Sequence, residues 1–100
     1  MKLIKLYVGH DNKTQKRFSE ELIKSLVGKY FNGFTIIKTN GVWKTASEES
    51  YIIELITDEA EKVNKLKSDL VTKLNQDSIL LTRTNLNTIE FYSVVSQVVE

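Results

Sequence analysis

The residues best suited to chemistry lie in one polar segment, 41–50, near the middle of the chain. Its candidates are the only tryptophan of the chain, a lysine, two adjacent carboxylates and a serine: Trp43, Lys44, Glu48, Glu49 and Ser50. An aromatic face beside acidic side chains suits a polar cationic ligand. The same residues are equally consistent with a tryptophan that fills a subunit interface next to a solvated acidic turn.

Three further candidates lie outside this segment. His10, the only histidine, falls in a polar loop between a predicted strand and a predicted helix, where backbone N–H groups can hold an anion. The same loop also reads as ordinary protein surface. Tyr7 and Tyr92 fall on predicted strands, where each either packs against neighbours or donates a phenol to a ligand in an interface cleft.

Composition excludes several kinds of chemistry. The chain has no cysteine and one histidine, which rules out disulfides, thiolate nucleophiles and two-histidine metal sites. We therefore expect no metal and no cofactor. Fourteen Lys and Arg against thirteen Asp and Glu leave a net charge of +1, and dedicated nucleic-acid binders are usually strongly basic. No set of nucleophile, base and orienting group is visible, so an enzyme built from these residues must catalyse a reaction that needs little acid–base help.

Hydropathy and length bound the cellular setting and the domain count. No apolar run approaches the roughly 20 residues of a membrane helix, and lysines interrupt the short apolar N-terminus. We expect a cytoplasmic protein that makes no contact with membrane or nucleic acid. One hundred residues are enough for one domain and too few for two, so residues 1–100 are expected to form a single domain.

The periodicity of apolar residues predicts five strands and two helices. Alternation or β-rich composition predicts strands, and apolar residues at helical spacing predict helices. The strands are expected near 2–8, 34–44, 50–57, 78–84 and 88–95, and the helices near 14–31 and 59–75. Asn40-Gly41 is either the hairpin turn or a kink before a longer hairpin tip at 43–49, and we favour the kink because Val42-Trp43-Lys44 has the composition of a strand.

The element order β-α-β-β-α-β is that of the ferredoxin-like α+β fold, here with an extra C-terminal strand. Two helices cover one face of such a sheet, and the other face should then be polar. The strand at 50–57 instead carries apolar residues on both faces, as does the run Ile79-Leu80-Leu81. We therefore expect self-association to cover the second face.

This layout resembles the PII and CutA superfamily of trimeric ferredoxin-like proteins, over nearly the whole chain. The local similarity is the hairpin, Val42-Trp43-Lys44 and then Glu48-Glu49-Ser50 before an apolar strand. Within that superfamily, the chain is similar to phage S-adenosylmethionine lyases and to CRISPR-associated lyases that act on the antiviral signal SAM-AMP. The resemblance implies a homotrimer with adenosyl-ligand sites between subunits.

The resemblance also implies roles for particular residues. In the lyases an aromatic residue of the hairpin precedes a catalytic glutamate, which corresponds to Trp43 followed by Glu48 or Glu49. Glu49 is favoured because a strand that begins near Ser50 would hold it more rigidly. The substrate's own carboxylate is the nucleophile, so no metal or histidine is needed. The alternative is a non-catalytic PII-like trimer that binds, senses or sequesters a nucleotide.

Overall fold

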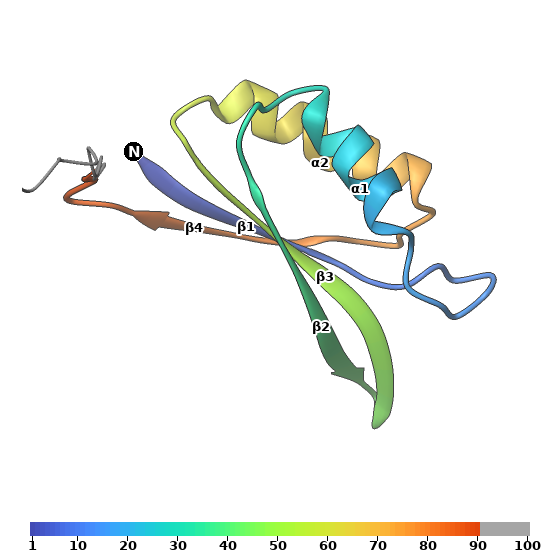
Figure 1. Ribbon diagram of the computed structural model, residues 1–100. Coiled ribbons are helices and arrows are strands. Elements are labelled where there is room, and N and C mark those ends of the chain that lie inside the picture. Colours follow the sequence, from blue (N-terminus) through green and yellow to red (C-terminus); the bar gives the residue numbers. More distant parts are fainter. Residues whose placement is uncertain (91–100) are drawn as a thin grey trace, which may run out of the picture.

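The chain folds into one antiparallel sheet with two helices on one side (Figure 1). A computed structural model describes residues 1–90, except for the side chain of Trp43. Its elements are β1 (Lys2–Val8), α1 (Glu20–Gly28), β2 (Thr35–Trp43), β3 (Ala46–Thr57), α2 (Ala60–Lys73) and β4 (Leu80–Asn85). The strands lie in the order β2-β3-β1-β4, and each neighbouring pair is antiparallel. This arrangement confirms the predicted α+β, ferredoxin-like fold.

The core lies between the helices and one face of the sheet. Alternate residues of β1 and β3 point towards α1 and α2 because successive side chains of a strand face opposite ways. The buried hydrophobic residues are at most 5% exposed: Ile4, Leu6, Val8, Ile23, Leu26, Val27, Tyr51, Ile53, Leu55, Val63, Leu66, Leu70 and Leu74. Both helices contribute one apolar stripe to this core, as their spacing predicts.

Helix α1 is shorter than the predicted range 14–31. Ser19 caps it, with extended backbone and a side-chain oxygen that accepts from the N–H of Leu22 at 3.2 Å. The preceding residues form turns, in which Gln15 has a φ of 58°. Phe18 has the helical spacing that suggested an earlier start, but it packs against the core from the loop. The predicted start at 14 was therefore wrong, and the helix ends at Gly28, three residues before the predicted end.

The β2–β3 hairpin turns at Lys44 and Thr45, whose φ values of 49° and 67° fit a two-residue turn of type I′. Asn40-Gly41 lies inside β2 and is not the hairpin turn, as we favoured. The longer tip expected at 43–49 was wrong, because Trp43 ends β2 and residues 46–49 belong to β3. Strand β3 begins at Ala46, earlier than the predicted residue 50. Because Val8, the last residue of β1, pairs with Tyr51, the outer part of the hairpin projects beyond the end of β1 (Figure 1).

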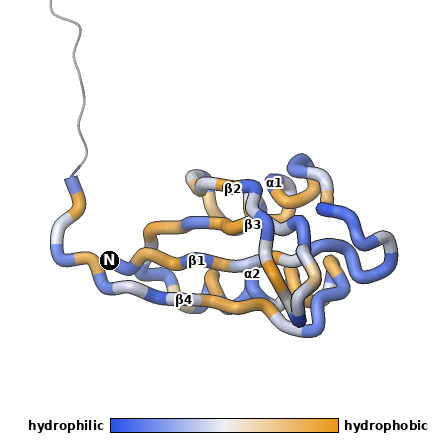
Figure 2. The backbone as a smooth tube through the Cα atoms, turned by 90° about the horizontal axis from the view of Figure 1, so that it is seen from below, coloured by the Kyte–Doolittle hydropathy of each residue, from blue (hydrophilic) through white to orange (hydrophobic). Residues whose placement is uncertain are grey.

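The sheet face opposite the helices carries a row of apolar side chains. Strand registers align one residue from each strand in this open-face row, which consists of Leu80, Tyr7, Ile52 and Ile37. Leu80 is 61% exposed and Ile37 is 38% exposed. Figure 2 shows the sheet from below, with hydrophobic stretches on neighbouring strands. The predicted two-sided apolar character of the strands is therefore present in the fold.

The remaining predicted elements agree within about two residues, apart from the last. The helix expected at 59–75 is α2, and the strand expected at 78–84 is β4. Of the strand expected at 88–95, residues 88–90 adopt no regular structure, and the rest lies outside the described residues. Within residues 1–90, no helix is long and apolar enough to cross a membrane.

Candidate functional site

Two of the candidate residues, His10 and Glu48, come together where the hairpin leaves the sheet. The backbone N–H of His10 donates to Oε1 of Glu48 at 2.9 Å, and the imidazole Nε2 lies 3.9 Å from the same oxygen. The Glu48 side chain is 28% exposed. Among the described residues no donor reaches its other oxygen, Oε2. One carboxylate oxygen is therefore fixed against the backbone of His10.

Two residues that the sequence analysis missed complete this arrangement. The N–H of Gly9 donates to Oε1 of Gln76 at 3.0 Å, and Nε2 of Gln76 donates to the carbonyl oxygen of His10 at 3.1 Å. A Cβ at Gly9 would lie only 2.2 Å from Oε1 of Glu48. We call Gly9, His10, Glu48 and Gln76 the Glu48 cluster. The glycine lets the carboxylate approach the backbone this closely.

Arg17 ties the loop that precedes α1 to the hairpin. Its Nε and Nη2 donate to the carbonyl oxygens of Ser50 at 3.3 Å and Thr39 at 3.1 Å. Its guanidinium lies 5.6 Å from the centroid of the Tyr51 ring, within the range of a cation–π contact. Oγ of Ser50 and Oγ1 of Thr39 lie 2.8 Å apart. The candidate residue Ser50 therefore forms part of the support of the hairpin, and Arg17 is a support that the sequence did not indicate.

Tyr51 is a buried phenol where the loop before α1 meets the hairpin. Its hydroxyl donates to the carbonyl oxygen of Phe18 at 2.6 Å, and only 2% of the residue is exposed. Burial is the main cause that raises the pKa of Tyr51 above its ordinary value. The phenol therefore stays protonated at neutral pH and fixes the loop before α1 through its hydrogen bond.

The structure separates Glu49 from Glu48. Because the two residues are neighbours in β3, their side chains point to opposite faces of the hairpin. Glu49 is exposed and pairs across the hairpin with Asn40. The reason for favouring Glu49, a strand that begins near Ser50, was wrong, because β3 begins at Ala46 and includes both acids. Glu48 is the acid that other elements hold.

The other candidates lie elsewhere. Tyr7 is part of the open-face row, where it pairs with Ile52 and Leu80. Lys44 occupies the hairpin turn. Trp43 is the last residue of β2, and its side chain, like the whole of Tyr92, lies outside the described part of the chain.

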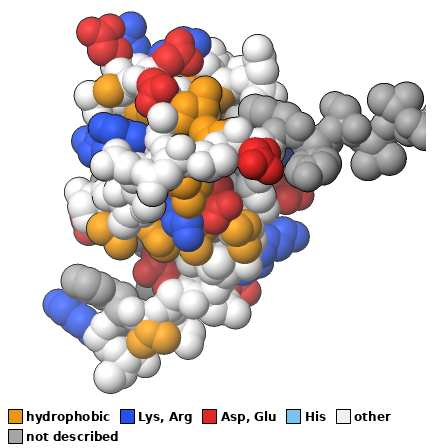
Figure 3. All heavy atoms as spheres, turned by 90° about the vertical axis from the view of Figure 1, so that its left-hand side faces the viewer, with side chains coloured by type: hydrophobic (Ala, Val, Ile, Leu, Met, Phe, Trp, Pro, Cys, Tyr) orange, Lys and Arg blue, Asp and Glu red, His pale blue; other side chains and the backbone are white. Residues whose placement is uncertain are grey.

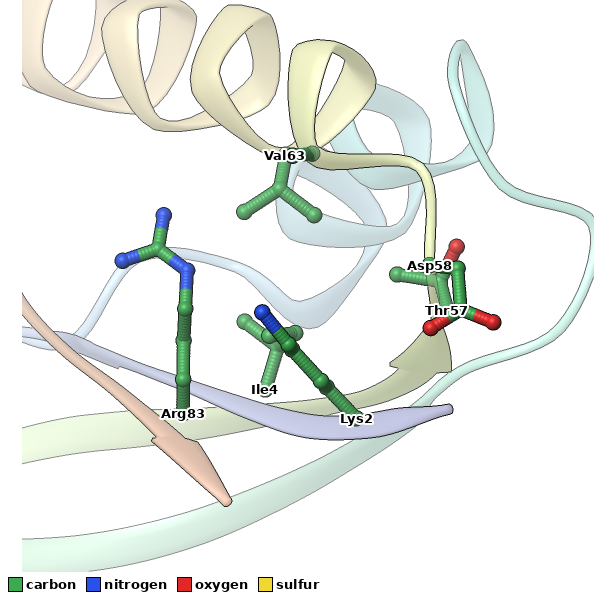
Figure 4. Close-up of a pocket in the computed structure, with 7 residues that line it drawn as sticks. Lys2, Ile4, Thr57, Asp58, Val63 and Arg83 are labelled. Atoms are coloured by element: carbon green, nitrogen blue, oxygen red, sulfur yellow. The ribbon is translucent and has the colours of Figure 1, made fainter. Parts of the chain in front are cut away.

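A small cavity lies at a different end of the molecule, between the start of α2 and the ends of β1 and β4 (Figure 4). It has a volume of about 30 Å³, and Lys2 and Arg83 extend into it from the sheet towards Val63. Ligand pockets usually measure about 300–1,000 Å³. This cavity has room for little more than ordered water. It cannot hold a nucleotide.

The charged side chains of the described surface form no metal-binding group. Within residues 1–90, no three or more His, Asp or Glu side chains gather where they could hold a metal ion. Figure 3 shows acidic and basic side chains interspersed on the face that includes the start of β1, rather than a field of one sign. On that face, the charge pattern does not resemble the basic stripe of a nucleic-acid site.

The fold places the chain among ferredoxin-like proteins, and comparison with solved structures agrees. A DUF3240 family protein from Shewanella baltica matches with a TM-score of 0.61 and 11% identity, covering 92% of this chain and 97% of that one. The designed protein Foldit4 matches with a TM-score of 0.50 and 14% identity, covering 86% and 98%. CutA1 from Pyrococcus horikoshii matches with a TM-score of 0.49 and 15% identity, covering 87% and 86%.

These identities establish a shared fold and nothing finer. The sequence matches no family model, and no curated protein matches it. The similarity to these structures therefore lies in the ferredoxin-like arrangement of strands and helices. Any activity must be argued from the residues of this chain.

Proposed function

We propose that this chain is the subunit of a PII-like homotrimer that binds an adenosyl sulfonium compound, S-adenosylmethionine or SAM-AMP, and cleaves it as a lyase. The observation that carries the proposal is the fixed carboxylate of Glu48, whose Oε1 accepts from the N–H of His10 at 2.9 Å. A carboxylate held through one oxygen and partly exposed suits a substrate that carries an ammonium group and ribose hydroxyls. Trp43, at the end of β2, is the proposed aromatic contact.

The proposed reaction requires mainly that the substrate be held in one conformation. The α-carboxylate of the methionine moiety attacks its own γ-carbon, and the bond between that carbon and sulfur breaks. The electron pair remains on sulfur, which leaves as the neutral thioether of methylthioadenosine or its AMP conjugate, and homoserine lactone forms. No proton is transferred. Holding the attacking and leaving groups in line can accelerate such a reaction by several orders of magnitude.

In the proposed trimer, neighbouring copies of the chain complete the ligand site at the hairpin. The open-face row has one apolar or aromatic residue on each of β1 to β4, and Leu80 in this row is 61% exposed. Covering this face with further copies would remove it from water and bring a neighbour's surface to the hairpin. Light scattering at micromolar concentration should give three times the 11.5 kDa mass of the chain. A mass of one chain would argue against the assembly.

The activity is tested by incubating the protein with S-adenosylmethionine and, separately, SAM-AMP, and by analysing the products chromatographically. We expect a methylthioadenosine product from at least one of them. Glu48→Gln should lower turnover by roughly 10²-fold, a barrier change of about 3 kcal/mol, because the anchoring charge is lost. Glu49→Gln is the matched control and decides between the adjacent acids.

The outcome also distinguishes the lyase from a trimer that only binds. Binding without product, detected through the fluorescence of the single tryptophan, would favour a sensing or sequestering role. In that case Glu48→Gln should weaken binding. A Glu49→Gln variant that loses turnover while Glu48→Gln retains it would assign the role to the exposed acid instead.

A further inference from the structure

We infer that Gln76 is a positioning residue that holds the Gly9-His10 backbone and, through it, the carboxylate of Glu48. The inference rests on the proposed function for its catalytic consequence, but the holding itself is a property of the free protein. Gln76 lies just beyond the end of α2, 66 residues from His10 and 67 from Gly9. No motif marks it in the sequence.

Both the oxygen and the nitrogen of the Gln76 amide form hydrogen bonds with the adjacent residues Gly9 and His10. Its Oε1 accepts from the N–H of Gly9 at 3.0 Å, and its Nε2 donates to the carbonyl oxygen of His10 at 3.1 Å. The same Nε2 also lies 3.2 Å from the carbonyl oxygen of Leu74, at the C-cap of α2. A side-chain amide carries an acceptor and a donor on separate atoms and does not titrate near neutral pH. The side chain therefore fastens the loop after β1 to the end of α2.

Glu48 closes the same loop from the other side. It accepts from the N–H of His10, which lies between the two groups that Gln76 holds. Two side chains thus hold three of the four backbone polar groups of Gly9 and His10: the N–H of Gly9 and both the N–H and the carbonyl of His10. A Cβ at Gly9 would lie 3.1 Å from Oε1 of Gln76 as well as 2.2 Å from Glu48. Any shift of the loop would therefore move the carboxylate.

The end of α2 is shaped to present Gln76 to this loop. Asn75 has a φ of 49°, a left-handed conformation that asparagine adopts more readily than most residues. Its carbonyl oxygen accepts from Nδ2 of Asn12 at 2.8 Å, which adds a second tie to the same loop. The N–H of Gln76 donates to the carbonyl oxygen of Val71 at 3.0 Å. The backbone on both sides of the contact is thus fixed.

The test replaces Gln76 by methionine, which keeps the length of the side chain and removes both hydrogen bonds to the loop together with the one to Leu74. Amide hydrogen exchange of Gly9 and His10, followed by NMR in the ligand-free protein, should accelerate by about tenfold or more, corresponding to about 1.4 kcal/mol of lost protection. Turnover of the adenosyl substrate should fall by about tenfold with KM changed less than about threefold, because geometry rather than binding is lost. Gln15→Met makes the same chemical change in an exposed turn and should leave both readouts unchanged.

Other results overturn the inference. Unchanged exchange at Gly9 and His10 would show that Gln76 does not hold the loop, and unchanged turnover would show that its hold does not matter for the reaction. Equal losses in Gln76→Met and Gln15→Met would assign the effect to general destabilisation. If the unmodified protein converts neither S-adenosylmethionine nor SAM-AMP, the proposed lyase fails together with the catalytic role. The exchange rates then decide separately whether Gln76 holds the loop.

Discussion

The two faces of the sheet are built from the same strands but have different surroundings. Neighbouring residues of β3 illustrate this: Ile53 is fully buried beneath the helices, whereas Ile52 lies on the open face. On β1, Leu6 and Tyr7 show the same division. Both faces of the strands carry apolar residues, but the two helices of the chain cover only one face. The folded chain is stabilised by one face, and the other is the face that the proposed trimer would cover.

The strongest test of this comparison is a pair of identical truncations on adjacent residues. Ile53→Ala should lower the free energy of unfolding by about 2–5 kcal/mol, because it leaves a cavity beneath the helices. Ile52→Ala should cost less than half as much in dilute protein, where its face is in water. Urea unfolding at several protein concentrations measures both. Equal losses at every concentration would mean that the faces do not differ as described.

An ion pair within the open face gives a smaller and concentration-dependent effect. Nζ of Lys5 lies 3.7 Å from Oε1 of Glu54, and the two side chains are 37% and 30% exposed. Glu54→Gln should cost about 1 kcal/mol or less in dilute protein, and less at high salt. If assembly removes the pair from water, the same substitution should cost about 3 kcal/mol in concentrated protein. A cost that is independent of concentration would argue against coverage of this part of the face.

The smallest expected effect lies between the chain just after α1 and helix α2, and it depends on pH. The Tyr30 hydroxyl donates to Oδ2 of Asp69 at 2.5 Å, and this hydrogen bond is the first cause that holds the pKa of Asp69 below its ordinary value. Nζ of Lys29 lies 3.6 Å from the same oxygen and acts in the same direction. A carboxyl whose pKa is lowered by folding stabilises the protein above its unfolded pKa of about 3.9. That stabilisation disappears as the pH falls through the lower folded value.

The measurement compares the parent protein with Asp69→Asn by thermal unfolding between neutral pH and acid. The parent should be more stable above about pH 4, and the two should converge as the pH falls further. Asp77→Asn provides the control, since Asp77 forms no ion pair among the described residues. A difference between parent and Asp69→Asn that persists unchanged into acid would contradict the role of the carboxylate.

Much of the fold could be predicted because its signals are local. The alternation in β1 and the apolar stripe of α2 place those elements within about two residues. The start of α1 could not be placed, because Phe18 has helical spacing but packs from a loop, and Ser19 supplies the cap. The start of β3 was also misplaced, since residues 46–49 form strand through pairing with β2 although their side chains are mostly polar.

Only part of the candidate site could be predicted from the sequence. Residue type alone singled out His10 and Glu48, as the only histidine and one of two adjacent acids. Nothing in the sequence paired them, or preferred Glu48 to Glu49, because the choice depends on which face of β3 meets the loop after β1. Gly9, Arg17 and Gln76 have ordinary residue types at ordinary loop positions, and their roles come only from contacts.

The amino-acid sequence by itself determined the order of elements and the apolar character of both sheet faces, since side-chain periodicity needs only the geometry of a strand or helix. The tertiary structure alone decided which acid is held and what holds it. The contacts of the Glu48 cluster join residues 38 to 67 positions apart, and such contacts form only after the sheet and helices have packed. A hydrogen bond of this kind depends on distance in space, which local sequence patterns do not encode.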